Sequence, residues 1–380
     1  MKKSEKKSKK FFFFKPFNIS QGKERFREKL NFDKNDFTIT SRNILILASF
    51  IFVLVLMVGG IYFFSEKRTN SEKIFVCGDG TFYNSCSLTK PYFCANGALL
   101  EKASICGCSN SLKKEGDRCV SNYQSFPKEI NLKYILRGEE KKINCIVYGG
   151  LVDYLFSFPK SINYYNDEKS FRSDFKLKNL NEKEQRELLL PLVIKIQNLT
   201  LVKEDQMRIA VSLVQNIPYV ESEKTFTIFG TSFNYSRYPY EVLYDGAGIC
   251  GEKSELLAFL LRELGYEVVF FYYEDENHES IGIRCPVKDS LNGTGYCFIE
   301  TTGPSIITDD SIEYVGGIKL VSKPEISLIS NGYSLEKNLY EYKDANTIGR
   351  IRNGGIVLFP SVKFNKLKEK YGLVEKYNLK

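Results

Sequence analysis

One glycine-rich segment constrains this chain more than any other part of it. Three glycines surround Cys250, and a regular series of residues then follows at steps of four and three: Cys250, Ser254, Leu257, Leu261 and Leu264. This spacing forms one face of a 3.6-residue period, and it predicts a helix that begins at Cys250 and ends before Gly265. A thiol in the first turn of a helix lies at the positive end of the helix dipole, which favours the thiolate. The segment therefore predicts a nucleophilic cysteine.

A general base for such a nucleophile can only come from His278, the single histidine in the chain. Strands are expected at 267–273, 279–285 and 295–301, with His278 at the start of the second and Glu300 near the end of the third. If the last two strands form an antiparallel hairpin, residues of like parity share a face. His278 and Glu300 then lie on one face, and Cys285 and Cys297 lie on the other. A cysteine, a histidine and a carboxylate from separate elements are typical of a catalytic triad.

The segments YPYEVLYDGAGICGEKSELLAFLLRELGY and GTGYCFIETT resemble the transglutaminase-like superfamily, and most closely its archaeal membrane-anchored members. The resemblance extends over residues 181–308, about a third of the chain. It implies an α+β, papain-like domain in which an antiparallel sheet packs on the nucleophile helix. It also implies that Cys250 is the nucleophile, His278 the general base and Glu300 the orienting acid.

The chain departs from that family's pattern at two positions. The family usually has Asp as the third member and often an aromatic residue two positions after the histidine, whereas this chain has Glu300 and Ser280, and it contains no Trp. Glu is one methylene longer than Asp and can still accept a hydrogen bond from an imidazole nitrogen.

The distribution of charge argues against a nucleic-acid partner. Residues 1–42 hold 13 Lys and Arg and 5 Asp and Glu, which accounts for the whole net charge of +8. The next residues, 44–64, are 21 apolar or uncharged residues, long enough to cross a bilayer as a helix. Because the basic flank is N-terminal, we expect a single-pass membrane protein with a cytoplasmic N-terminus and an extracytoplasmic C-terminal part.

The first segment expected outside the membrane is dense in cysteine. Six cysteines fall within 43 residues, and in an oxidising compartment such a segment is typical of a small disulfide-stabilised module. Fifteen pairings are possible. A zinc site is the alternative, but it is disfavoured because the segment has no CxxC pair and no nearby histidine. Pairing of these six cysteines with one another, and of Cys285 with Cys297, leaves Cys145 and Cys250 as free thiols.

These features predict an order of parts along the chain: a basic tail at 1–42, a transmembrane helix at 43–64, a linker at 65–76, a cysteine-rich module at 77–120, a small β unit at 121–176 and a transglutaminase-like domain at 177–380. The β unit is expected to hold strands at 134–137 and 142–148.

Two helices are expected to shield the sheet of the last domain. One is capped by Asn181 and is kinked or divided at Pro191, and the other spans 203–215. Farther on, strands are expected at 318–322 and 325–329 and a helix at 362–371. In the nucleophile helix itself, Glu252 and Lys253 are expected to be exposed, as first-turn residues usually are.

These features predict a thiol enzyme that transfers an acyl group at amide bonds and needs neither a cofactor nor a metal. With water as acceptor it is a cysteine peptidase or amidase, with a protein or peptide as substrate, and this is the preferred hypothesis. One alternative is a transglutaminase that crosslinks proteins through a lysine amine. The other is an inactive cell-surface scaffold or binding module. The backbone N–H of Cys250 is the expected oxyanion donor.

Overall fold

The computed structural model describes residue 49 and residues 52–55, 75–158, 162, 171–228, 230–311, 313–314 and 318–373. The expected tail, transmembrane helix and linker lie almost wholly outside these ranges, apart from residues 49, 52–55, 75 and 76. Among the residues that are described, no helix combines the length and apolar character needed to cross a bilayer. Phe75–Lys380 forms one compact unit.

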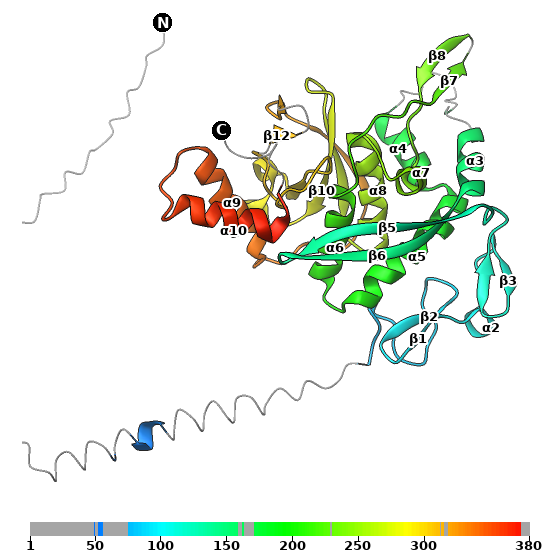
Figure 1. Cartoon of the computed structure of the whole chain (residues 1–380), viewed down its shortest axis with the longest axis horizontal. Coiled ribbons are helices and arrows are strands. Elements are labelled where there is room, and N and C mark those ends of the chain that lie inside the picture. The colour runs from blue at the N-terminus through cyan, green and yellow to red at the C-terminus, as the bar shows by residue number, and fades with distance from the viewer. Residues whose placement is uncertain are drawn as a thin grey trace, which may run out of the picture. The chain divides into compact units, whose positions relative to one another are not determined.

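This unit is a mixed α+β structure with small antiparallel sheets (Figure 1). Its largest sheet has the strand order β11-β10-β9-β14, and every neighbouring pair is antiparallel. The four strands are β9 (Val268–Tyr273), β10 (His278–Arg284), β11 (Tyr296–Ile299) and β14 (Glu325–Ser330). The strands expected at 267–273, 279–285, 295–301 and 325–329 are therefore confirmed, with ends that shift by one or two residues, whereas the strand expected at 318–322 is limited to Ile318–Lys319.

Both faces of this sheet are covered, which explains the continuous apolar run VVFFYY in β9. Val268 and Phe270 belong to the main core, together with helix α8 (Cys250–Glu263). Val269 and Phe271 face the opposite way, into a second cluster that includes Phe298. The strand thus alternates between two interiors instead of between core and solvent.

Helix α8 begins at Cys250, as the periodicity predicts, and residues 251–261 are all buried. Gly265 follows its end with φ +92°, a conformation that favours glycine. Four further helices pack around it: α4 (Arg172–Leu180), α5 (Lys183–Leu199), α6 (Lys203–Gln215) and α7 (Pro239–Asp245). Helix α6 matches the expected range 203–215.

Helix α5 differs from expectation in two ways. Its N-terminal cap is Glu182, whose carboxylate accepts hydrogen bonds from the N–H groups of Glu184 and Gln185, and not Asn181. The carboxylate one residue later reaches the free N–H groups of the first turn, so it takes the capping role. The helix also continues through Pro191 as one element, although two shorter helices were one of the expected outcomes. Tertiary packing compensates for the proline, since Leu189, Leu192 and Val193 are all buried in the main core.

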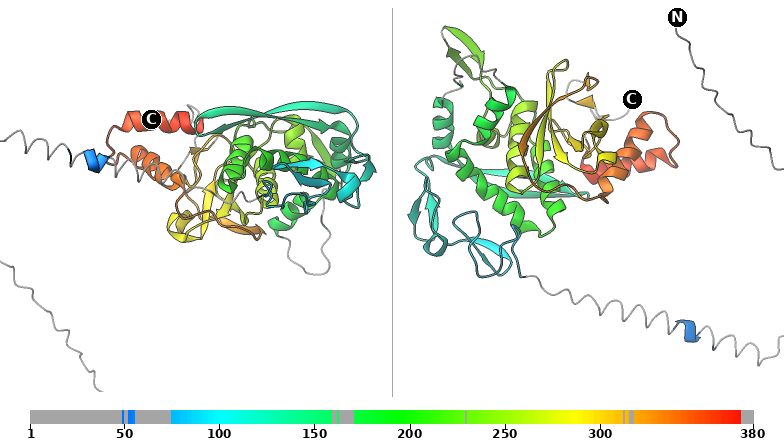
Figure 2. Two further views of the ribbon diagram at one scale, coloured as in Figure 1. Left: turned by 90° about the horizontal axis from the view of Figure 1, so that it is seen from below. Right: turned by 180° about the vertical axis from the view of Figure 1, so that it is seen from behind.

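The expected β unit is a long two-stranded hairpin, β5 (Pro127–Leu136) and β6 (Glu139–Tyr148). It crosses α6 along one side of the unit (Figures 1 and 2). The apolar residues Leu132, Tyr134, Ile143 and Val147 join the same core as α5, α6 and α8.

The cysteine-rich module contains three disulfides, Cys77–Cys94, Cys86–Cys106 and Cys108–Cys119. It packs on α5: the side-chain amide of Asn198 accepts from the N–H of Leu99 at 2.8 Å and donates to its carbonyl at 3.1 Å. The prediction that these six cysteines pair among themselves is confirmed. The elements of the module are β1 (Tyr92–Ala95), β2 (Ala98–Glu101), α2 (Ala103–Cys106), β3 (Lys113–Glu115) and β4 (Arg118–Val120).

The remaining elements connect or cover this framework. The hairpin of β7 and β8 extends away from the rest of the unit (Figures 1 and 2). The expected C-terminal helix is present as α10, beside an unexpected helix, α9. These elements are α3 (Gly149–Ser157), β7 (Thr225–Ile228), β8 (Thr231–Asn234), the short 3-10 turns η1 (Val287–Asp289) and η2 (Leu291–Gly293), β12 (Glu313–Tyr314), β13 (Ile318–Lys319), α9 (Tyr340–Arg352) and α10 (Pro360–Tyr371).

Candidate active site

The loop before Cys250 is held on both sides. Helix α7 ends at Gly246, which has φ +65° and therefore favours glycine. Gly248 then donates its N–H to the carbonyl of Pro218 at 3.1 Å, which joins the loop to the end of α6. The carboxylate of Glu252 accepts from the N–H of Ile249 at 3.0 Å. These contacts determine where the first turn of α8 starts, and so where the sulfur lies.

Glu252 and Lys253 do not match the expectation that they are exposed, since their exposed fractions are 1% and 0%. Glu252 also accepts from the backbone N–H and the guanidinium of Arg237, at 2.8 and 3.1 Å. The prediction of exposure was wrong because the N-terminal turn of α8 is covered by segments distant in sequence.

Lys253 extends into the protein interior and not toward a substrate. Its ammonium donates to the carbonyl oxygens of Ile217 at 2.5 Å and Thr302 at 3.1 Å, and it lies 3.5 Å from that of Gln215. It thereby connects α8 to the end of α6 and to the chain that follows β11. Lys253 is a structural anchor beneath the candidate site.

His278 and Glu300 meet through a hydrogen bond of 2.9 Å between Nε2 and Oε2. Both side chains are buried, with exposed fractions of 1% and 0%. In the β10–β11 ladder, Ile281 lies opposite Ile299, so residues of like parity are paired. The disulfide Cys285–Cys297 forms between the two odd-numbered positions, as the parity argument predicts.

Glu300 is fixed by the two threonines that follow it. Its Oε1 accepts from the N–H of Thr301 at 2.8 Å, and from the N–H and hydroxyl of Thr302 at 2.7 Å each. Burial on its own favours the neutral acid, but the hydrogen bond and charge of His278 and the donors of Thr302 lower the pKa of Glu300 below its usual value. The group is therefore an anion that orients the imidazole.

The second contact of His278 is with the sulfur of Cys250. Burial alone lowers the pKa of His278, but hydrogen bonds to Cys250 and Glu300 and their negative charges outweigh it and raise the pKa to about 9. Since Nε2 binds Glu300, Nδ1 is the ring nitrogen left for the sulfur. At neutral pH His278 is therefore an imidazolium, and it lies beside the half-buried sulfur of Cys250.

A bridge of hydroxyl groups ties the cysteine helix to the strands that carry the other two residues. Ser254, one turn after Cys250, donates to the carbonyl of Glu279 at 3.3 Å, and its hydroxyl lies 3.0 Å from that of Thr301. Thr301 in turn donates to the carbonyl of Cys250 at 3.4 Å. The relative positions of Cys250, His278 and Glu300 therefore depend on side chains that bond across α8, β10 and β11.

Several residues of the site were not anticipated from the sequence. Thr302 is one, although the run Glu-Thr-Thr places two donors directly after the acid, which is a usable signal. Glu279, next to His278, is another: its carboxylate pairs with Arg172 and Lys176 of α4 at 2.6 and 2.8 Å. No sequence signal connects α4 to β10, because they are about a hundred residues apart.

As the first residue of α8, Cys250 has a backbone N–H that the helix itself does not use. Such a donor is available to a developing oxyanion. In the described part of the chain, no group of three or more His, Cys, Asp or Glu side chains is arranged to hold a metal ion.

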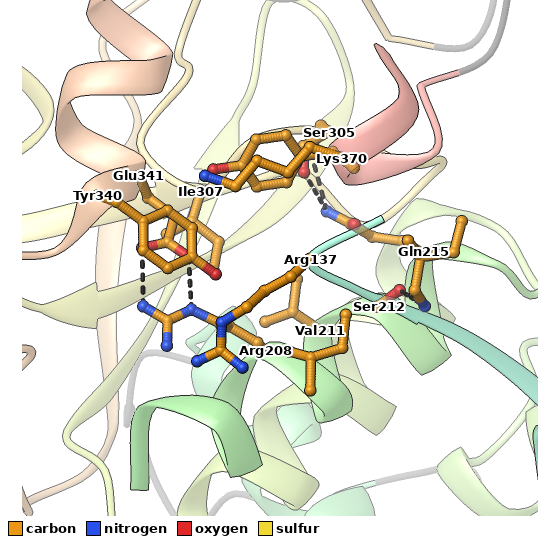
Figure 3. A pocket seen from close by; sticks show the side chains of 13 residues that line it. Arg137, Arg208, Val211, Ser212, Gln215, Ser305, Ile307, Tyr340, Glu341 and Lys370 are labelled. Carbon is orange, nitrogen blue, oxygen red and sulfur yellow. Dashed lines mark hydrogen bonds and ion pairs between the residues drawn. The ribbon is translucent and has the colours of Figure 1, made fainter. Parts of the chain in front are cut away.

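A small cavity of about 30 Å³ lies elsewhere, between β5, α6 and the C-terminal helices (Figure 3). It contains the ion pair between Arg208 and Glu341, and Gln215 bonds to Ser305 on its other side. A water molecule needs about 10–15 Å³ of such volume, so the cavity has room for water but not for a substrate.

No protein-family model and no curated protein matches this sequence. Among solved structures, three of LapG from Legionella pneumophila show similarity. One is 16% identical with a TM-score of 0.21 and covers 35% of this chain and 75% of that chain. The EGTA-treated form is 16% identical with a TM-score of 0.24, and the similarity covers 47% of this chain and 97% of that chain. The calcium-bound form is 15% identical with a TM-score of 0.18, and the similarity covers 48% of this chain and 92% of that chain.

Proposed function

We propose that this protein is a thiol enzyme that transfers an acyl group at amide bonds through Cys250, His278 and Glu300, and that it acts as a cysteine peptidase or amidase on a protein or peptide. One observation supports the proposal: the only histidine of the chain is hydrogen-bonded both to Cys250 and, through Nε2, to the carboxylate of Glu300. A buried histidine with a purely structural role needs no thiol at the start of a helix.

In the proposed reaction, the sulfur of Cys250 attacks the carbonyl carbon of an amide. The carbon–nitrogen bond then breaks, His278 gives its proton to the departing amine, and a thioester remains on Cys250. Water next gives a proton to His278 and adds to the thioester as hydroxide, and the carbon–sulfur bond then breaks, which releases the carboxylic acid and restores the Cys250 thiolate beside the imidazolium. The N–H of Cys250 stabilises the oxyanion of each tetrahedral intermediate, and Glu300 keeps the imidazole in place.

The fold we propose for the unit that carries this site is the transglutaminase-like, papain-like arrangement. It is supported by the order of its parts: a helix that begins at the cysteine, then the antiparallel strands β9, β10 and β11, with His278 opening the second strand and Glu300 just after the third. Hydrolysis is preferred over crosslinking because water is always present, whereas a crosslinking enzyme must also bind a lysine-bearing protein.

We propose further that the protein is anchored in the cell membrane by residues 44–64, with its N-terminus in the cytoplasm and its C-terminal part outside. Four disulfides in Phe75–Lys380 support an oxidising location for that part, because such bonds are rare in the cytosol. A cysteine-labelling reagent that cannot cross membranes tests this: in intact cells it should reach Cys250 but not a cysteine introduced at Ser20. Labelling only after lysis contradicts the topology.

The enzymatic proposal is tested with the full-length chain and its Cys250→Ala and Cys145→Ala variants. Cys145 is a matched control because it is the other free thiol, and burial raises its pKa to about 11. We expect iodoacetamide to label Cys250 even at pH 6, and a peptide library to be cleaved by the Cys145→Ala variant but not by the Cys250→Ala variant. An inert Cys250 thiol together with no cleavage would favour the scaffold alternative. A product that joins a glutamine peptide to a lysine peptide would favour the crosslinking alternative.

A further inference from the structure

Arg172 and Glu279 form an ion pair close to the candidate nucleophile. Glu279 follows His278 in β10 and is buried, with a side-chain exposed fraction of 3%. One of its oxygens, Oε2, lies directly against the backbone of Gly251, the residue after Cys250. The other oxygen, Oε1, accepts from Nε of Arg172 at 2.6 Å. The carboxylate of Glu279 therefore lies between Arg172 and the first turn of α8, and contacts both.

The guanidinium of Arg172 is also oriented by an aromatic ring. Its central carbon lies 4.0 Å from the centre of the Tyr272 ring, a stacking geometry that suits the flat guanidinium. Tyr272 belongs to β9, so the position of Arg172 is determined by two strands of the main sheet. A side chain held at two points loses less freedom on binding a ligand than an unrestrained one.

Most of the hydrogen-bonding capacity of Arg172 is unused. A guanidinium has five N–H donors, and within the described residues only Nε makes a hydrogen bond. The side chain is 45% exposed, although the carboxylate that holds it is buried. Lys176 also contacts Glu279 at 2.8 Å, but it is only 13% exposed and pairs with the buried carboxylate of Glu255 at 2.6 Å as well. The two cations therefore balance two buried carboxylates, and Arg172 is the one of the two that reaches the surface with unused donors.

We propose that Arg172 forms a carboxylate-binding subsite beside Cys250, and that the enzyme prefers substrates with an acidic residue close to the bond it cleaves. The two terminal nitrogens of a guanidinium match the two oxygens of a carboxylate, and such paired bonds are both strong and specific. Because Arg172 is joined through Glu279 to the residue that follows Cys250, the acidic residue of the substrate is expected close to the scissile bond. Burial lowers the pKa of Arg172, but Glu279 above all, then Tyr272 and to a smaller extent Cys250 raise it, in agreement with this proximity. This inference rests on the proposed function for its substrate but not for its geometry.

The geometry is tested by alkylation, which needs no peptidase activity. In a full-length Cys145→Ala background, Cys250 is the one free thiol. The probes are iodoacetate, which carries a carboxylate, and iodoacetamide, which does not. The measured quantity is the alkylation rate with iodoacetate divided by the rate with iodoacetamide. We expect Arg172→Gln to lower this ratio about two- to five-fold, the range that corresponds to one partly exposed charge pair. Arg172→Lys should restore part of the ratio, since it keeps the charge but not the paired donors.

Arg186→Gln is the matched control. Arg186 is 40% exposed and pairs at 2.9 Å with Glu263, a carboxylate that is 13% exposed, much as Arg172 pairs with Glu279. Glu263 lies at the opposite end of α8, about 20 Å from Cys250 at 1.5 Å per residue. This variant should leave the ratio unchanged. If Arg172→Gln does not fold, the ratio is measured on the parent protein at rising salt concentration. Salt screens the charge of Arg172 and should therefore lower the ratio of the iodoacetate rate to the iodoacetamide rate. A ratio unaffected by both Arg172→Gln and salt overturns the subsite.

Cleavage of a peptide library then separates this inference from the proposed function. We expect the parent to prefer Asp or Glu near the cleaved bond and Arg172→Gln to lose that preference while still cleaving. Cleavage that depends on Cys250 but shows no acidic preference overturns the subsite and leaves the enzyme intact. No cleavage at all counts against the proposed function, while the alkylation ratio still decides whether Arg172 binds a carboxylate.

Discussion

Gly251 and Glu279 are packed so closely that no side chain fits between them: a Cβ on Gly251 would lie 2.3 Å from Oε2 of Glu279. The carboxylate cannot swing aside freely, because Arg172 and Lys176 hold its two oxygens at 2.6 and 2.8 Å. The glycine after Cys250 therefore allows the cysteine helix to approach the strand that carries His278.

Gly251→Ala is accordingly expected to destabilise the protein by about 1–3 kcal/mol, the usual cost of forcing an extra methyl group into a packed site. It should also slow the labelling of Cys250, since the first turn of α8 must move away from β10. Urea unfolding and iodoacetamide labelling measure the two effects. Gly349→Ala is the control, because its nearest neighbour is a serine hydroxyl at 3.6 Å and alanine favours a helix. Equal stability of the two variants would contradict the packing argument.

The sequence predicts the parts of the site that depend on local patterns. The start of α8, the end at Gly265 and the strands around His278 all follow from periodicity and turn residues. The parity of the β10–β11 hairpin was sufficient to group His278 with Glu300 and Cys285 with Cys297. These features require only that each segment bury its apolar side chains in a regular element.

The parts that the sequence does not predict depend on contacts between distant segments. Lys253 was expected to be exposed, and it is buried because residues 217 and 302 cover the first turn of α8. Arg172 was missed because α4 is rich in charged residues and gives no clear apolar face, so that its place beside β10 is set by ion pairs. Helix α9 was missed for a similar reason, since few of its residues are apolar.

Glu300→Gln tests whether the acid orients the histidine. The amide retains the shape of the side chain and can still accept from Thr301 and Thr302, but it presents an NH₂ group instead of an anion to Nε2 of His278. The imidazole then loses the charge that stabilises its protonated form. We expect the rate of peptide cleavage to fall about 10²-fold or more, and the unfolding midpoint at neutral pH to fall as well, because Glu300 is one of the two groups that raise the pKa of His278.

If Glu300→Gln cleaves peptides at the parent's rate, Glu300 does not orient His278. Thr302→Val provides an intermediate case. It removes one of the three donors to Oε1, at 2.7 Å, and leaves the carboxylate in place. It should therefore reduce cleavage by less than Glu300→Gln does.

Lys253→Met is expected to affect stability more than chemistry. The substitution keeps the length of the side chain and removes an ammonium that donates to buried carbonyl groups on two separate segments. Leaving such acceptors unpaired costs about 1–3 kcal/mol for each, so a loss of about 3 kcal/mol is expected. Lys288→Met is the control, since its side chain is 74% exposed and should contribute little. Chemical unfolding of both variants measures the difference, and similar midpoints would contradict the anchoring role of Lys253.

The stability of the protein should decline between pH 6.5 and about pH 9. His278 has a pKa of about 9 in the folded protein, compared with 6.5 as its ordinary value. Below pH 6.5 both the folded and unfolded states carry this proton, so its stabilising effect is fully present. As the pH rises, the unfolded state releases the proton first, and the advantage of the folded state is lost by about pH 9. The free energy of unfolding should fall by about 3 kcal/mol at most, because one pKa unit corresponds to about 1.4 kcal/mol.

Because the chain has one histidine, NMR can follow its ring protons without ambiguity. The midpoint of that titration should lie near pH 9 in the parent, and it should move toward 6.5 in Cys250→Ala, since the thiol and its charge are among the causes that raise the pKa. Urea unfolding between pH 6 and 9.5 should show a smaller decline in His278→Gln than in the parent. A parent midpoint near 6.5, or parallel stability curves for parent and variant, would mean that His278 is not held between Cys250 and Glu300 in solution, because only those two partners outweigh the opposing effect of burial.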